Sequence, residues 1–174
     1  MSESGSARRE LLGPAYPDDT GAVGDEVAAA LTAYDAARTD ARAYAEVVAA
    51  LQRGRLLVPV VAVLGEVEVD EAGLARDKSS DMAAVLLTGA DGRLALLAFT
   101  GVEAMAAWDP AARPVPVLTQ LAAQSAIQEG ASALVVDVAG PVRVVVEGED
   151  LRGLAAGWTL AQVDGDPAWV RPSD

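Results

Sequence analysis

Apolar residues recur every three or four positions from residue 23 to about residue 38, which predicts an amphipathic helix. A second helix is expected to follow, with its apolar face running from Tyr44 to Leu51. Thr39–Asp40 supplies an N-cap before it, and Gly54 is a typical residue just after a helix end. The joint between the two runs is short. The sequence therefore predicts a helical hairpin.

From Arg55 onward the apolar pattern changes to that of strands. Leu56 to Leu64 is a continuous apolar run that contains Pro59, which favours a buried or edge strand. Residues 65–71 then alternate strictly between apolar and acidic, as expected for a strand with its carboxylates in solvent. Residues 72–81 are polar and predict a loop.

Two hairpins follow in the pattern. The first covers residues 82–100 and turns at Gly89–Gly92, and the second covers residues 133–147 and turns at Ala139–Pro141. In both, apolar runs of strand length flank a cluster of turn-forming residues. We expect each pair of runs to form an antiparallel ladder.

Residues able to cap helices precede three further apolar stretches. Thr100 and Glu103 have the spacing of a capping box, which predicts that Thr100 caps a short helix. Thr119 and Asp150 are expected to cap the next two helices. The proline-rich segment 109–116 is expected to be extended or turning.

The order of these elements favours an α+β fold, in which an N-terminal helical hairpin precedes a mixed, mostly antiparallel sheet built from hairpins with helices packed on it. Residues 1–22 lack any periodic pattern and are predicted to be a disordered tail. Residues 23–160 are expected to form a single domain. Residues 161–174 would be a C-terminal extension or an edge hairpin, with Trp169 as its exposed aromatic residue.

Charge excludes several partners. The chain has 26 acidic and 13 basic residues, for a formal net charge of −13. Such a protein repels nucleic-acid phosphates and anionic membranes unless its arginines are clustered, and here they are spread along the chain. The longest apolar stretch is about ten residues, half the length of a membrane-spanning helix. We expect no nucleic-acid or membrane partner, and a cytoplasmic location by default.

Catalytic side chains are scarce. The chain has no His and no Cys, which removes the imidazole base, the thiolate nucleophile and zinc sites made from these residues. The acidic run Glu66–Glu71 lacks the spacing of a calcium loop and is typical of a solvated strand face. We expect no catalytic residue, no metal and no cofactor. An enzyme that uses carboxylates, assisted by a metal, stays open as an alternative.

Some polar and aromatic side chains near element ends are candidates for binding. Lys78, the single lysine, could bind an anion together with Ser80 in the polar loop. Arg113 lies between prolines, where its guanidinium could face an anionic partner. Trp108 is more typical of a core lid, and Thr100 is more typical of a helix cap than of a nucleophile.

The chain from Lys78 to Gly157 resembles the SseB N-terminal domain family, and in particular its actinobacterial single-domain members. The positions that carry the resemblance are Lys78, Asp81–Ala83, Asp91–Arg93, Ala98–Thr100, Trp108, Ala112–Val117 and Asp137–Pro141. The family's name records a phenotype, enhanced serine sensitivity. The resemblance implies a small α+β domain without an established activity, and it carries over no catalytic residue.

The sequence thus leads to one functional hypothesis and two alternatives. The hypothesis is a non-enzymatic binding or regulatory module that recognises a protein partner or a small anionic ligand. The alternatives are the carboxylate-dependent enzyme and a structural subunit that forms a homodimer. Two acidic side chains from different elements that converge in one pocket with a raised pKa would favour the enzyme.

Overall fold

The computed structural model describes residue 16, residues 18–63 and residues 81–172. The predicted helical hairpin is confirmed, with α1 at Asp25–Ala36 and α2 at Ala41–Gln52. Asp40 caps α2 as expected, because its carboxylate accepts a 2.8 Å hydrogen bond from the Arg42 amide. The predicted alternating strand at residues 65–71 lies outside the described residues.

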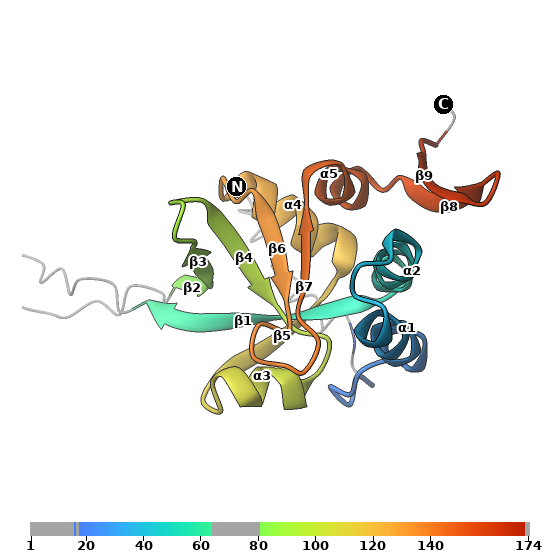
Figure 1. Ribbon diagram of the computed structural model, residues 1–174. Coiled ribbons are helices and arrows are strands. Elements are labelled where there is room, and N and C mark those ends of the chain that lie inside the picture. Colours follow the sequence, from blue (N-terminus) through green and yellow to red (C-terminus); the bar gives the residue numbers. More distant parts are fainter. Residues whose placement is uncertain (1–15, 17, 64–80, 173–174) are drawn as a thin grey trace, which may run out of the picture.

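The strands form two larger sheets and a terminal hairpin, all of which Figure 1 shows. The first sheet has the order β2-β1-β5, with β1 at Arg55–Val63, β2 at Asp81–Ala84 and β5 at Arg113–Leu118. The second has the order β3-β4-β6-β7, with β3 at Leu86–Thr88, β4 at Leu94–Ala98, β6 at Ala133–Val136 and β7 at Val144–Glu147. Helices and mixed sheets together confirm the α+β class.

The first predicted hairpin is divided between the two sheets. The first apolar run of this hairpin, residues 82–88, is interrupted at Val85 and forms two strands. The first of them, β2, pairs with β1, whereas the second, β3, pairs with β4. The Val85 carbonyl instead accepts a 3.0 Å hydrogen bond from the Leu97 amide. The second hairpin forms as predicted, because β6 and β7 are antiparallel. The pairing of β4 with β6 is parallel, and it brings their carboxyl ends to the same edge.

The three later helices form, but their expected caps are wrong. The helices are α3 at Val102–Trp108, α4 at Thr119–Gln128 and α5 at Gly148–Ala156. Neither Thr100, Thr119 nor Asp150 makes the capping hydrogen bond, since the N-cap positions are one or more residues away. Each of these side chains bonds to a distant part of the chain instead: Thr100 to Asp137, Thr119 to the Gly54 carbonyl and Asp150 to Trp169.

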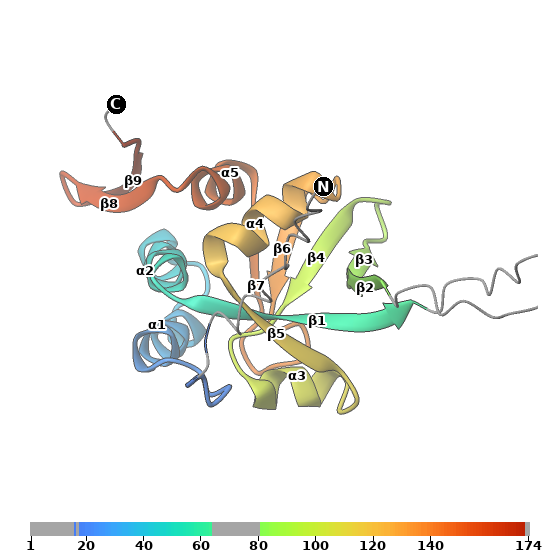
Figure 2. The ribbon, with the colours of Figure 1, turned by 180° about the vertical axis from the view of Figure 1, so that it is seen from behind.

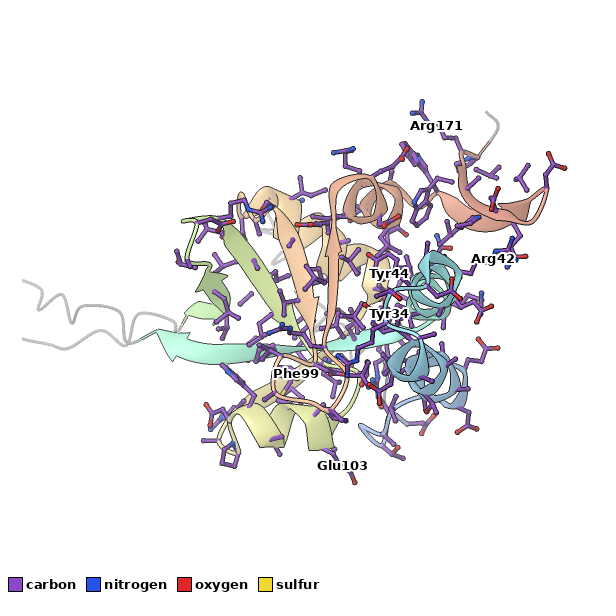
Figure 3. The ribbon with its side chains drawn as sticks, in the orientation of Figure 1. Tyr34, Arg42, Tyr44, Phe99, Glu103 and Arg171 are labelled. Carbon is purple, nitrogen blue, oxygen red and sulfur yellow. The ribbon has the colours of Figure 1, made fainter. Side chains whose placement is uncertain are left out.

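Alternate side chains at the end of β4 and in the residue after it enter two separate cores. Leu96 and Ala98 lie in the larger core with residues of α2, α4 and α5. Leu97 and Phe99 face the other way and pack with Leu57 of β1 and Met105 of α3. Phe99 and Leu57 also exchange backbone hydrogen bonds of 2.8 Å, and Figure 3 places Phe99 where β1 crosses the second sheet. Phe99 therefore joins the two sheets.

The C-terminal residues form a hairpin that is a separate two-stranded sheet, with β8 at Thr159–Val163 and β9 at Asp166–Val170. The expectation that Trp169 is exposed is wrong. Its ring lies half-buried on α5, and its indole N–H donates a 2.8 Å hydrogen bond to Asp150. A Cβ added at Gly153 would come within 2.6 Å of this ring. The glycine is what lets the hairpin approach the helix.

We expect Gly153→Ala to destabilise the protein by about 1–2 kcal/mol, because the new methyl group displaces the Trp169 ring. In a Trp169→Ala background there is no ring to displace, so Gly153→Ala should instead raise the free energy of unfolding by about 0.5–1 kcal/mol, because alanine has the higher helix propensity. Urea denaturation of the four proteins of this cycle measures both values. If Gly153→Ala lowers the free energy of unfolding equally with and without Trp169, the close contact between Gly153 and the Trp169 ring is contradicted.

Candidate functional site

The carboxyl ends of the parallel strands β4 and β6 carry a buried polar pair. Thr100 lies just beyond β4 and Asp137 follows β6 directly. The Asp137 carboxylate accepts two hydrogen bonds from Thr100, one from its amide at 2.8 Å and one from its hydroxyl at 2.7 Å. Thr100 is 5% exposed and Asp137 is 4% exposed. Ligands of sheets with parallel strands commonly bind at this end.

Asp137 has an unusual backbone and an unusual environment. Its φ of 54° lies in the left-handed region, which few residues other than glycine adopt. Burial raises the pKa of its carboxyl group, and the hydrogen bonds from Thr100 oppose that effect. Across residues 18–63 and 81–172, no Lys or Arg forms an ion pair with Asp137. The buried carboxyl group of Asp137 thus has a neutral side chain as its partner within the described residues.

The direction of the hydrogen bonds determines what this pair offers a ligand. An ionised carboxylate can only accept, so the Thr100 hydroxyl must donate its one proton to Asp137. The remaining lone pairs of the hydroxyl and of the carboxylate are then available to accept hydrogen bonds from a ligand. While Asp137 is ionised, the side chains of the pair present hydrogen-bond acceptors and no donor.

The pair opens on a cavity of about 910 Å³, which we call the α1–α3 cavity. It lies between α1, α3, the β6–β7 loop and residues 20–23, and Figures 1 and 2 show these segments at one end of the molecule. Its charged lining residues are Asp35, Glu103 and Asp137, all acidic. Arg38 bonds to Asp35 and to the Pro141 carbonyl, and so ties α1 to the β6–β7 loop.

Residues 19–23, the N-terminal segment, run along this end of the sheet. The Arg55 guanidinium holds them, with bonds of 2.5 and 2.9 Å to Asp19, 2.7 Å to the Ala22 carbonyl and 2.5 Å to the Thr100 carbonyl. A Cβ at Gly101 would lie 3.0 Å from the Val23 nitrogen, so this glycine permits the contact. A second hollow of about 470 Å³ borders the same segment.

We expect Arg55→Met to release the N-terminal segment. The Arg55 guanidinium holds the pKa of Asp19 below its usual range. The side chains of this ion pair are only 13% and 14% exposed, so its loss leaves buried acceptors without a donor. NMR should report a rise in the Asp19 pKa and faster hydrogen exchange of the Val102 amide, which bonds to Gly21.

Arg53→Met is the matched control. Arg53 pairs with Glu26 at 3.1 Å, but both side chains are well exposed, at 60% and 71%. Such surface pairs contribute about 0–1 kcal/mol, so the Val102 amide should exchange as in the wild type. Equal effects of the two substitutions would argue that Arg55 does not hold the segment.

A pH dependence follows from the buried carboxyl of Asp137. Because its pKa is raised in the folded state, the folded protein takes up this proton at a higher pH than the unfolded chain does. Relative to Asp137→Asn, the free energy of unfolding of the wild type should therefore increase as the pH falls toward about 4, near the unfolded pKa. Urea denaturation of both proteins from pH 7 to pH 4 measures the difference. A difference that decreases on acidification contradicts the assignment.

The sequence-predicted candidates fall in different places. Thr100 is in the site. Trp108 is half-buried against Phe99, with ring centroids 5.6 Å apart, and it does not line the α1–α3 cavity. Arg113 is exposed at the start of β5 and also lies outside the cavity lining. Lys78 and Ser80 lie outside the described residues, so their roles stay predictions.

Asp137 and Arg55 were not among the site residues predicted from the sequence. A run of apolar residues ending in Asp137 marks only a strand end, and Arg55 looks like any charge that precedes a strand. One available signal was the short sequence Asp137–Pro141, which combines an acid with turn-forming residues after a buried strand. The parallel pairing that joins it to Thr100 has no local signature.

Within the described residues, no three or more acidic, His or Cys side chains are grouped so that they could hold a metal ion. The helices of this part of the chain are all too short or too polar to cross a membrane. No match to the chain was found among the curated proteins or among the solved structures. The family model for the SseB protein N-terminal domain, however, matches residues 27–153. This range contains the buried pair and most of the cavity lining, and the chain belongs to the SseB N-terminal domain family.

Proposed function

We propose that the protein is a non-enzymatic binding module and that the α1–α3 cavity is its ligand site. The observation that carries the proposal is the buried Thr100–Asp137 pair opening on a cavity of about 910 Å³. Small-molecule sites are typically concave and mostly apolar, with a few fixed polar groups that orient the ligand. The cavity fits this description, because its lining consists largely of Ala, Gly, Val and Leu residues around one oriented pair.

The arrangement of the carboxylates favours binding over catalysis. Three acidic residues from separate elements line the cavity, Asp35 on α1, Glu103 on α3 and Asp137 after β6, so the question is whether their carboxylates converge. Asp35 is held by Arg38, and Figure 3 shows Glu103 pointing outward from α3. A mechanism that uses one carboxylate as acid and another as base needs two acids facing one substrate. Asp137 is the buried acid of this cavity and faces a threonine.

An NMR screen with a library of small fragments tests the proposal. Fragments that bind should shift the amide signals of Thr100, Gly101 and Gly140, which border the cavity. Ala107→Trp places a bulky ring in the lining and should abolish these shifts. Ala106→Trp is the matched control, because Ala106 is exposed on the same helix but does not line the cavity.

Two outcomes would contradict the proposal. In one, fragments bind the wild type and Ala107→Trp equally well. In the other, their shifts gather on the open face of the second sheet, where Leu87, Ala95 and Val145 border a separate hollow of about 340 Å³. The second outcome would move the binding function to that face.

A further inference from the structure

We infer that the ligand of the α1–α3 cavity carries an alkylammonium group on a small apolar body. This inference rests on the proposed function, since it names the chemistry of a ligand for the same cavity. Three properties of the described residues lead to it: the charge of the buried pair, the direction of its hydrogen bonds and the nature of the cavity walls.

The first property is an uncompensated charge. Buried carboxylates in proteins are normally paired with a cation, because removing a charge from water is costly. Asp137 is 4% exposed, and in the described part of the chain its carboxylate bonds only to the neutral Thr100. Arg55 reaches the Thr100 carbonyl, but its charge is matched by Asp19. A cationic ligand would supply the missing partner.

The second property is the donor and acceptor pattern. The Thr100 hydroxyl donates its proton to Asp137, so the side chains of the pair offer a ligand only hydrogen-bond acceptors. A ligand carboxylate or phosphate would bring further acceptors and would meet only repulsion at this point. An ammonium group brings three donors and no acceptor, which complements both oxygens.

The third property is the wall of the cavity. Beside the buried pair, its sides are formed by small apolar groups, including Ala28 and Leu31 of α1, Ala104 of α3 and Val142 of the loop. These surfaces can cover an aliphatic chain. The cavity lining contains no Lys or Arg; Asp35 is paired with Arg38 and Glu103 points outward from α3 (Figure 3), so Asp137 is the acid that faces the ligand. A cation with a short apolar tail matches both the walls and the charge.

Probes of matched size separate these contributions. We would titrate the full chain at pH 7 with n-pentylammonium, 1-pentanol and pentanoate, following the amides of Thr100 and Gly140 by NMR. The ammonium probe should bind at least about tenfold more tightly than the alcohol, because it forms charge-assisted hydrogen bonds. Pentanoate should be the weakest of the probes.

Asp137→Asn is the decisive variant. The asparagine can accept from the Thr100 amide and donate to its hydroxyl, so both contacts survive while the charge is lost. The affinity for n-pentylammonium should fall about tenfold or more, to the level of 1-pentanol. The affinity for 1-pentanol should not change. Glu129→Gln, an exposed acid that does not line the cavity, is the charge control and should leave all affinities unchanged.

Thr100 provides a second, independent variant. Thr100→Ser keeps the hydroxyl and should retain ammonium binding, whereas Thr100→Val removes an acceptor and should weaken it. Circular dichroism and urea denaturation check that each variant is folded. If Thr100→Val does not fold, the comparison of Asp137→Asn with Glu129→Gln still decides the question.

The same chemistry could come from a free amine or from a lysine of another protein. A short apolar peptide with one lysine, compared with its acetyl-lysine form, distinguishes the two sources. Tight binding of the lysine form that depends on Asp137 supports the ammonium site with a protein as its source. Weaker binding of the peptide than of n-pentylammonium supports a free amine.

Failure of this inference differs from failure of the proposed function. If 1-pentanol and n-pentylammonium bind equally well, and Asp137→Asn changes neither, the ammonium inference is wrong while the cavity remains a binding site. If pentanoate binds most tightly at the same amides, the ligand is an anion and the inference is overturned. If no probe or fragment perturbs these amides, the proposed function itself is wrong.

Discussion

Replacing Phe99 with alanine is expected to lower the free energy of unfolding by about 3–5 kcal/mol, the range observed for truncating a buried aromatic residue. Phe99 is fully buried and packs on Trp108. Its backbone joins β4 to β1 through reciprocal hydrogen bonds with Leu57. Because the side chain lies where the two sheets meet, its loss leaves a cavity that neither sheet can close alone.

Urea denaturation followed by circular dichroism measures this loss. Phe99→Leu retains most of the volume and should cost roughly half as much. Val145→Ala is the surface control, since Val145 is 39% exposed, and it should change stability by less than about 0.5 kcal/mol. A Phe99→Ala protein as stable as the Val145→Ala protein would show that the sheets do not depend on this contact.

The second large effect is expected for Asp137→Leu. Leucine leaves the buried Thr100 amide and hydroxyl without a partner and adopts a positive φ less readily than aspartate. The buried donor and the backbone strain together should cost about 3–5 kcal/mol. Asp137→Asn is the matched variant, because asparagine tolerates the same backbone and preserves both hydrogen bonds.

Thermal and urea unfolding of the two Asp137 variants at pH 7 check this expectation. Asp137→Asn should be at least as stable as the wild type at this pH, because it removes a buried charge. A large loss in Asp137→Asn would mean that the charge itself stabilises the fold through a cation partner. Equal stability of Asp137→Leu and Asp137→Asn would rule out the hydrogen bonds to Thr100 as a structural requirement.

Much of the fold follows from local pattern. The helices α1 and α2, the long strand β1, the hairpin of β6 and β7 and the terminal hairpin were all predictable from periodicity and turn residues. These features depend on residues that are close to one another in the sequence, so a local pattern is sufficient to predict them. The break at Val85 was not predictable, because it depends on which of two sheets each half of the run joins.

The wrong helix caps show a second limit. Thr100 and Asp150 are residues that favour N-cap positions, and their spacing to the next helix is appropriate. In the folded chain each meets a stronger partner far away in sequence, Thr100 in Asp137 and Asp150 in Trp169. The helices instead begin so that Gly101 and Glu147 occupy the N-cap positions. At these positions the tertiary contacts, and not the local capping pattern, therefore determine which hydrogen bonds the side chains make.

The candidate site was predictable only in part. Thr100 was identified as a candidate binding residue because it lies near the end of a predicted element. Its bond to Asp137 played no part in that prediction. Parallel pairing of β4 with β6 brings the two residues together, and strand order is not encoded in either segment alone. Arg55 acquires its role only when residues 19–23 lie along the sheet end.

The central claim is that the α1–α3 cavity binds a cationic ligand through the Thr100–Asp137 pair. A crystal structure of the protein soaked with n-pentylammonium tests it most directly. We expect the ligand in this cavity, with its nitrogen within hydrogen-bonding distance of the Asp137 carboxylate or the Thr100 hydroxyl and its alkyl chain between α1 and α3. Ligand bound at another surface, or in the cavity with its nitrogen pointing away from the pair, would contradict the claim.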